Sequence, residues 1–225
     1  MKTKLLLLVC SLFICVSVIG QNACKAYYPF EEGAKFEITS FNKKGEKESI
    51  VNYEVTKIDN NVATIKTIVF DEKGKEITTT SYQITCDGHS ISIDFKSMMN
   101  SEMFKQYKDM DMEITGNNIE LPNDLQVGQS LKDANLNMAL DMGGMKMNMT
   151  MDMINRTVNS KESVTTPAGT FDCYALSYTT EMKMGMKMTF NFKEWIAKGV
   201  GVIRSETYSK NGKLTGYSEL TSFTK

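Results

Sequence analysis

One turn motif occurs three times in the chain and limits its fold more than any other feature. In each copy an aromatic residue precedes Asn, Asp or Ser, and a glycine follows four positions after the aromatic. This pattern is typical of a type I turn that ends in a left-handed glycine and joins two antiparallel strands through a G1 bulge. The motif therefore predicts three β-hairpins, at FNKKGEK (41–47), FDEKGKE (70–76) and YSKNGKL (208–214).

The segments around these turns are rich in β-branched and aromatic residues, as strands are. DNN at 59–61 and CDGH at 86–89 indicate further tight turns. MEITGNNIELP at 112–122 has the pattern of another hairpin, with a Gly-Asn turn. Most of the chain is therefore predicted to be antiparallel strands.

One segment departs from this pattern. Met99, Met103 and Tyr107 recur at every fourth position, which predicts a short helix over residues 97–107. We therefore expect a mainly β fold, either a curved antiparallel sheet or a half-open β-barrel built of hairpins, with one short helix.

The N-terminus has the pattern of a signal peptide. Lys2 and Lys4 precede an apolar run, and Val18 and Gly20 are small enough for a cleavage site, so residues 1–20 are predicted to be the signal peptide. The protein is expected to be exported, to the periplasm or the extracellular space. No later stretch is apolar enough to span a bilayer, so we expect no transmembrane segment.

The remainder of the chain shows no clear domain boundary. It contains three prolines and no low-complexity linker. Residues 21–225 are therefore predicted to form a single antiparallel β domain. A two-lobed arrangement hinged near residues 97–130 is the alternative.

Charge and composition exclude several classes of function. The net charge is −1 and the lysines are scattered among acids, so the clustered positive charge of a nucleic-acid-binding protein is absent. His89 is the only histidine, so a catalytic triad or a zinc site would depend on that residue alone. A solvated turn is favoured for it over a nucleophilic pair with Cys86. No phosphate-binding glycine loop or nucleophile elbow occurs. We predict no enzymatic activity, no catalytic residue and no cofactor.

Three cysteines follow the predicted signal peptide: Cys24, Cys86 and Cys173. They allow one disulfide in three ways. We favour Cys24 with Cys86, because that bond would attach the N-terminus to the end of a strand. Cys173 would then be a buried small apolar residue.

Two stretches place methionine at every second position, in a chain that has 17 methionines. Alternate residues of a strand lie on one face, so each stretch is predicted to be a strand with one apolar and one polar face. If the two strands are neighbours, their methionines form one contiguous thioether surface that faces inward. The residues are Met145, Met147, Met149, Met151 and Met153 in the first stretch and Met182, Met184, Met186 and Met188 in the second.

This methionine surface has three interpretations. It could be ordinary core, although methionine is flexible and specifies a core poorly. That softness suits a wall that binds an apolar small molecule or a lipid. Thioethers also suit Cu(I), but neither stretch contains a histidine or cysteine, and we assign no metal site.

Several motifs carry a resemblance to a known family. Their order along the chain is similar to that in the TapB-like family of exported bacterial proteins, whose activity is undefined. The resemblance covers nearly all of residues 21–225, implies no catalytic residue, and suggests a tetratricopeptide-repeat protein as partner. The motifs are CKAYYPFEEGAKFE (24–37), CDG (86–88), QYKDM (106–110), VGQSL (127–131), SVTTPAGTFDCY (163–174) and EWIAKGVGVIRSETY (194–208).

We expect, from these features together, an exported, non-enzymatic β protein that binds an apolar ligand or a protein partner in the cell envelope. One alternative is a Cu(I)-handling protein that uses the methionine stretches. The other is a purely structural or scaffold protein.

Overall fold

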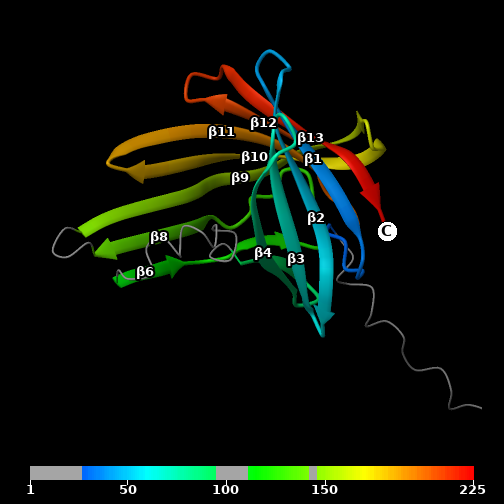
Figure 1. Ribbon diagram of the computed structural model, residues 1–225, viewed down its shortest axis with the longest axis horizontal. Helices are drawn as coiled ribbons and strands as arrows, with labels where there is room; N and C mark the ends of the chain where they lie inside the picture. Colours follow the sequence, from blue (N-terminus) through cyan, green and yellow to red (C-terminus); the bar gives the residue numbers. More distant parts are fainter. Residues whose placement is uncertain (1–26, 95–110, 142–145) are drawn as a thin grey trace, which may run out of the picture.

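The computed structural model describes residues 27–94, 111–141 and 146–225 (Figure 1). All regular secondary structure within these ranges is β, which confirms the prediction of a mainly β fold. The predicted signal peptide (1–20) and the predicted helix (97–107) lie outside the described residues. Within them, no helix is long and apolar enough to cross a membrane.

Thirteen strands form the described structure. They vary in length, and β9 and β10 are the longest. In chain order they are β1 (Lys35–Asn42), β2 (Lys47–Asp59), β3 (Val62–Asp71), β4 (Glu76–Cys86), β5 (Ser90–Ile93), β6 (Asp111–Gly116), β7 (Ile119–Pro122), β8 (Ala134–Asp141), β9 (Lys146–Thr166), β10 (Gly169–Met184), β11 (Met186–Ala197), β12 (Gly201–Ser209) and β13 (Leu214–Thr224).

All thirteen strands belong to one open sheet, in the order β6-β8-β9-β10-β11-β12-β13-β1-β2-β3-β4-β5-β7, and their pairings are antiparallel. The two edge strands, β6 and β7, are consecutive in the chain. The predicted hairpin at 112–122 is therefore wrong. Ile114 of β6 is paired with Met138 of β8, whereas Leu121 of β7 is paired with Ile91 of β5.

The three hairpins that the turn motif predicts are confirmed. They connect β1 to β2, β3 to β4 and β12 to β13, and their glycines Gly45, Gly74 and Gly212 have φ of 79°, 81° and 74°. The residue after each aromatic fixes the turn. The Oδ1 atom of Asn42 accepts hydrogen bonds from the backbone N–H groups of Lys44 and Glu46. These side-chain bonds stabilise the turn through groups that lie within four residues of Asn42.

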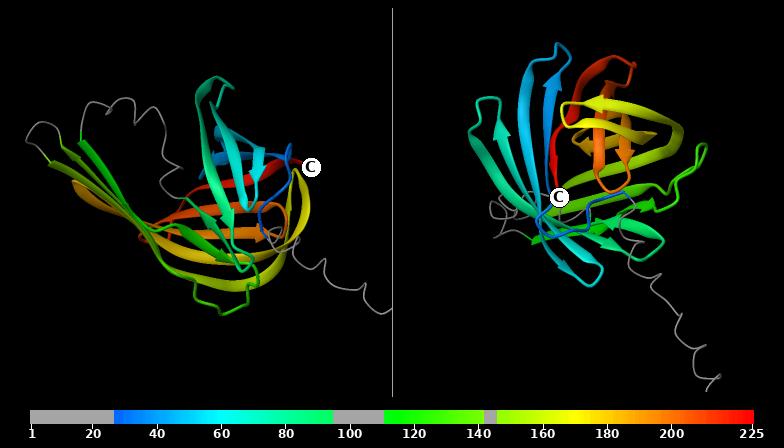
Figure 2. Two further views of the ribbon diagram at one scale, coloured as in Figure 1. Left: turned by 90° about the horizontal axis from the view of Figure 1, so that it is seen from below. Right: turned by 90° about the vertical axis from the view of Figure 1, so that its right-hand side faces the viewer.

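The sheet bends so that strands from its two halves share one core (Figure 2). One cluster of buried side chains joins Val55 of β2 and Ile84 of β4 to Val158 of β9 and Leu176 of β10. These strands are distant in the sheet order, so only a bend can bring them into contact. The finer prediction of a half-open barrel stays a prediction.

A second apolar cluster covers the opposite face of the central strands. Ala175 and Trp195 are paired in register and belong to this cluster, whereas Leu176 and Ile196 belong to the first. Successive residues of a strand point to opposite faces. Strands β10 and β11 are therefore buried on both sides over this part of their length.

Gly116, the last residue of β6, is expected to tolerate no side chain. Its φ is 141°, and an added Cβ would collide with the backbone carbonyl oxygen of Asn135. We expect Gly116→Ala to lower the free energy of unfolding by at least about 2 kcal/mol, as urea denaturation can measure. Gly185→Ala is the matched control, since Gly185 also has a positive φ (75°) but nothing within 4 Å of the added atom. Equal effects of the two substitutions would show that the β6 edge can shift to make room.

Candidate functional site

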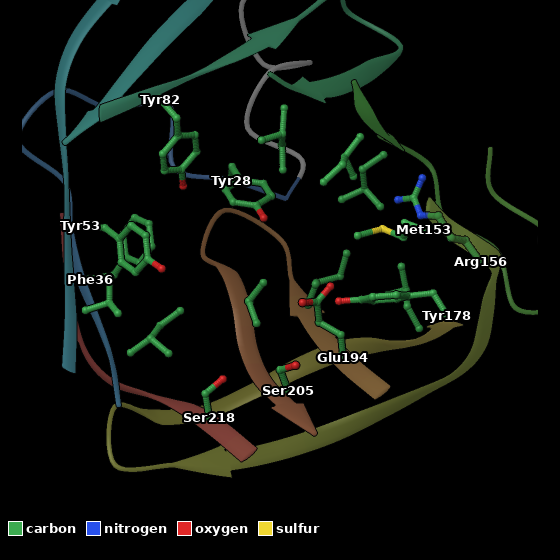
Figure 3. Close-up of a pocket in the computed structure, with 18 of the residues that line it drawn as sticks. Tyr28, Phe36, Tyr53, Tyr82, Met153, Arg156, Tyr178, Glu194, Ser205 and Ser218 are labelled. Carbon is green, nitrogen blue, oxygen red and sulfur yellow. The ribbon is translucent and has the colours of Figure 1, made fainter. Parts of the chain in front are cut away.

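A cavity of about 350 Å³ lies on the concave face of the sheet (Figure 3). Its lining comes from strands of both halves of the sheet and from the segment before β1. Most of the lining side chains are aliphatic or aromatic. The residues are Tyr28, Phe36, Ile38, Ser40, Val51, Tyr53, Tyr82, Ile93, Ile119, Leu121, Met153, Arg156, Leu176, Ser177, Tyr178, Glu194, Ile196, Val202, Ser205 and Ser218.

Three serines on neighbouring strands help to make this space. Ser205 of β12 is paired with Ser218 of β13, which is paired in turn with Ser40 of β1. Directly paired residues share a face of the sheet. A row of small side chains on one face leaves a hollow where larger side chains would meet those of the other half.

Aromatic rings form much of the cavity wall. The rings of Phe36 and Tyr53 are stacked with centroids 4.5 Å apart, and burial raises the pKa of Tyr53 to about 12. Burial also raises the pKa of Tyr28, Tyr82 and Tyr178. All four phenols are therefore neutral at physiological pH, and they offer apolar surface together with hydroxyl groups.

Arg156 is a buried arginine at one side of the cavity, with 5% of its surface exposed. Its Nη1 atom donates a hydrogen bond to the backbone carbonyl of Lys132, and Nη2 donates to that of Glu120 at 3.0 Å. Burial lowers its pKa, although an arginine stays charged in proteins. The preceding residue, Asn155, has a φ of 57°, at a point where the register with β10 shifts. This bulge changes the direction in which Arg156 points.

Glu194 of β11 extends its carboxylate into the cavity, where Tyr178 also ends (Figure 3). Burial raises the pKa of Glu194 from 4.5 to about 7, and the nearby charge of Arg156 only partly opposes this rise. Among the described residues, none donates a hydrogen bond to this carboxylate or forms an ion pair with it. Glu194 is therefore a half-buried acid that lacks a hydrogen-bond or ion-pair partner among the described residues and faces a largely apolar space.

The predicted methionine strands are neighbours, as expected. Met151 of β9 is paired with Met182 of β10, and Met149 is paired with Met184. Because paired residues share a face, these side chains form one continuous surface. It extends along β9 toward Met153, which lines the cavity.

The second methionine stretch is not one strand, contrary to the prediction. β10 ends at Met184, Gly185 turns with a φ of 75°, and β11 begins at Met186. Met188 is paired back with Met182. Alternate positions therefore stay on one face although the chain reverses direction, so the sequence pattern is the same for a strand and for this hairpin.

The methionine surface is open where it reaches the β10–β11 turn. The exposed fractions are 54% for Met184, 80% for Met186 and 44% for Met188. A closed core is therefore wrong for these three residues. Met145 lies outside the described residues, and the remaining predicted positions are half-buried: Met147, Met149, Met151, Met153 and Met182.

The cysteines agree with the sequence as far as they are described. Cys86 is disulfide-bonded, and Cys173 is free and buried. Cys24 lies outside the described ranges, so its pairing with Cys86 stays a prediction. Burial raises the pKa of Cys173 to about 11, which keeps its thiol protonated.

His89 lies in an exposed turn, where Asp87 Oδ1 accepts its backbone N–H at 2.9 Å. This agrees with the expectation of a solvated turn. In the part of the chain that the structure describes, no group of three or more His, Cys, Asp or Glu residues is arranged to hold a metal ion.

Glu194 and Arg156 are the site residues that sequence reasoning missed. Glu194 follows Phe190 and Phe192 at alternate positions and precedes Ile196, so the strand pattern already placed a carboxylate on an apolar face. Arg156 gave no comparable signal, because the bulge at Asn155 interrupts the alternation that would reveal which face it occupies.

Two solved structures share this fold. One is a candidate exported protein with a YmcC-like fold from Bacteroides fragilis. It is 21% identical, with a TM-score of 0.71, and the match covers 90% of this chain and 100% of that chain. The other is a candidate lipoprotein from Parabacteroides distasonis, 22% identical with a TM-score of 0.72, matched over 89% of this chain and 99% of that chain. Identities this low establish the fold alone.

Among curated proteins, no sequence matches the chain. The TapB-like name that the sequence motifs suggested stays a prediction. The family model described as DUF3108-like matches residues 31–220. The chain therefore belongs to the DUF3108-like family.

Proposed function

We propose that this protein binds an apolar or amphipathic small molecule in the cavity on the concave face of its sheet, without catalysing a reaction on it. The observation that carries this proposal is the cavity of about 350 Å³, with a wall of aliphatic and aromatic side chains and few polar groups. Sites for small molecules have this size and character, since apolar walls supply affinity and a few polar groups supply orientation.

The methionine surface supports the same proposal. Met153 lines the cavity, and Met151 and Met149 follow at alternate positions of β9. Methionine side chains adapt to ligands of different shapes. The half-buried methionines would extend the apolar wall beyond the cavity and contact the part of a ligand that protrudes from it.

We place this activity in the cell envelope. The signal peptide predicted at residues 1–20 would direct export. The two structurally similar proteins are described as a candidate exported protein and a candidate lipoprotein. A tetratricopeptide-repeat protein as partner, which the TapB-like resemblance implies, stays a prediction beside this one.

The proposed binding site can be tested with a substitution whose larger side chain fills part of the cavity. Ser218→Leu is expected to weaken binding of an apolar dye such as phenylnaphthylamine by at least about tenfold, because the larger side chain would occupy the hollow beside Ser205 and Ser40. The measurement is a fluorescence titration of the protein that follows signal-peptide removal. Native mass spectrometry of the same protein, purified from its own cell envelope, would identify a bound ligand.

Ser81→Leu is the matched control. Ser81 is exposed and precedes the cavity residue Tyr82 on β4, so its side chain points to the other face of the sheet. We expect this variant to bind the dye as the wild type does. Equal binding by all three proteins, or no binding by the wild type, would contradict a ligand site in the cavity.

A Cu(I)-binding function is the alternative that keeps the methionines at its centre. Its support is the pairing of Met149 with Met184 and of Met151 with Met182, which brings several thioethers onto one face. Thioethers are neutral at any pH, so Cu(I) binding would persist in acid, and norleucine in place of these methionines would abolish it.

A further inference from the structure

The polar groups of the cavity carry information about the ligand. Glu194 and Arg156 line it together, but their surroundings differ. Arg156 already donates hydrogen bonds to the backbone carbonyls of Lys132 and Glu120. Arg156 therefore holds these two segments of the chain without the help of a ligand.

Among the described residues, Glu194 has no such partner. Its neighbours in register are Leu176 on one side and Ser205 on the other. The titratable groups that interact with it are Arg156, Tyr28 and Tyr178, and none of them makes a hydrogen bond or an ion pair with it in the described structure. A half-buried carboxylate that faces a largely apolar cavity without a contacting donor is poorly solvated, and a cation that also donates hydrogen bonds relieves this cost.

We propose that the ligand is a cationic amphiphile, whose primary ammonium group binds the Glu194 carboxylate while its apolar chain contacts the aromatic wall and the methionine surface. This proposal rests on the proposed function and names the chemical class of the ligand. A hydroxyl group could donate one hydrogen bond but would leave the negative charge of the carboxylate uncompensated. A carboxylic acid would place a second negative charge beside Glu194.

Three probes that share one alkyl chain separate these classes: decylamine, decanol and decanoic acid. Each is titrated into wild type and Glu194→Gln by displacement of phenylnaphthylamine at about pH 8 and about pH 5.5, which lie on either side of the Glu194 pKa of about 7. At the higher pH the wild type is expected to bind decylamine at least about tenfold more tightly than decanol. Glu194→Gln should lose this preference and bind decanol as the wild type does. The wild type should also lose it at the lower pH, where Glu194 is protonated.

Glu206→Gln is the matched control. Glu206 follows the cavity residue Ser205 on β12 and so faces the other side of the sheet, where its carboxylate forms an ion pair with Arg204. This variant should keep the preference for the amine. Any one of three results would overturn the ligand class and leave apolar binding intact. The wild type could bind decylamine and decanol equally, it could prefer decanoic acid, or Glu194→Gln could keep the preference for the amine. Failure of all three probes to displace the dye would overturn the ligand class and the proposed function together.

Discussion

Arg156→Met is expected to lower the free energy of unfolding by at least about 3 kcal/mol in urea denaturation. Methionine preserves much of the apolar volume but donates no hydrogen bond. The backbone carbonyls of Lys132 and Glu120 would both lose the donor that Arg156 supplies. Both hydrogen bonds are part-buried, and an acceptor left without a partner away from water costs about 1 to 3 kcal/mol. The positive charge that partly stabilises ionised Glu194 would also be lost.

Lys132→Met provides the control for this effect. Lys132 also carries a positive charge, and its Nζ atom lies 2.7 Å from Glu120 Oε2, but 76% of the side chain is exposed. An exposed ion pair contributes at most about 1 kcal/mol, so this variant should remain close to the wild type in stability. Similar losses of stability in the two variants would mean that the loss of a positive charge, and not the loss of the two hydrogen bonds to backbone carbonyls, accounts for the effect at Arg156.

Arg156 helps to shape the cavity through the segments of the chain that it connects. Its guanidinium connects β9 to Glu120 in edge strand β7 and to Lys132 in the segment before β8. The segment before β8 already lies beside β9, because β8 is paired with β9, whereas β7 is the far edge strand of the sheet and meets β9 only because the sheet bends. A single side chain thus helps to hold the bend that encloses the cavity, and its loss should affect both stability and ligand binding.

The hairpins were predictable because their determinants are local. Asn42 and Asp71 accept hydrogen bonds from backbone N–H groups within four residues of themselves, and Gly45 and Gly74 adopt the positive φ that the turns require. Such a unit has the same geometry in any antiparallel sheet. The sequence therefore indicates it without any knowledge of the rest of the fold.

The order of the strands was not predictable in this way. Residues 112–122 have the local pattern of a hairpin, yet β6 and β7 lie at the two edges of the sheet. Asn117 lies between them, and its side-chain Oδ1 accepts the backbone N–H of Asn135 at 2.6 Å. This long-range contact holds the chain where it passes from one edge to the other, and no local pattern can encode such a contact.

The candidate site was predictable only in part. The methionine pattern correctly indicated neighbouring strands, because alternation reports the face that each residue occupies. It could not reveal that the surface is open near Gly185, since exposure depends on what the rest of the chain covers. Glu194 left a signal in the alternation of β11, whereas the bulge beside Arg156 removed its signal.

The stability of the wild type relative to Glu194→Gln is expected to fall by up to about 3 kcal/mol between about pH 4 and pH 8. Burial raises the pKa of Glu194 from 4.5 to about 7, and each unit of pKa corresponds to about 1.4 kcal/mol. The folded protein holds this proton more tightly than the unfolded chain. The stabilisation is therefore fully present below pH 4.5 and is lost as the pH rises through about 7. Urea denaturation across this range, with both proteins in the same buffers, measures the difference.

Glu48→Gln controls for the loss of a carboxylate as such, because Glu48 is exposed, and its difference from the wild type should not vary with pH in this way. A stability difference between the wild type and Glu194→Gln that does not vary with pH would show that water solvates the carboxylate charge. It would remove the argument for a cationic ligand.

A stability difference that follows the predicted pH dependence would have the opposite consequence. A carboxylate that destabilises the folded protein at neutral pH supports a role for Glu194 in binding and not in stability. Decylamine at one fixed concentration and about pH 8 should then stabilise the wild type by more than it stabilises Glu194→Gln, because a ligand that binds only the folded state stabilises it by an amount that grows with its affinity.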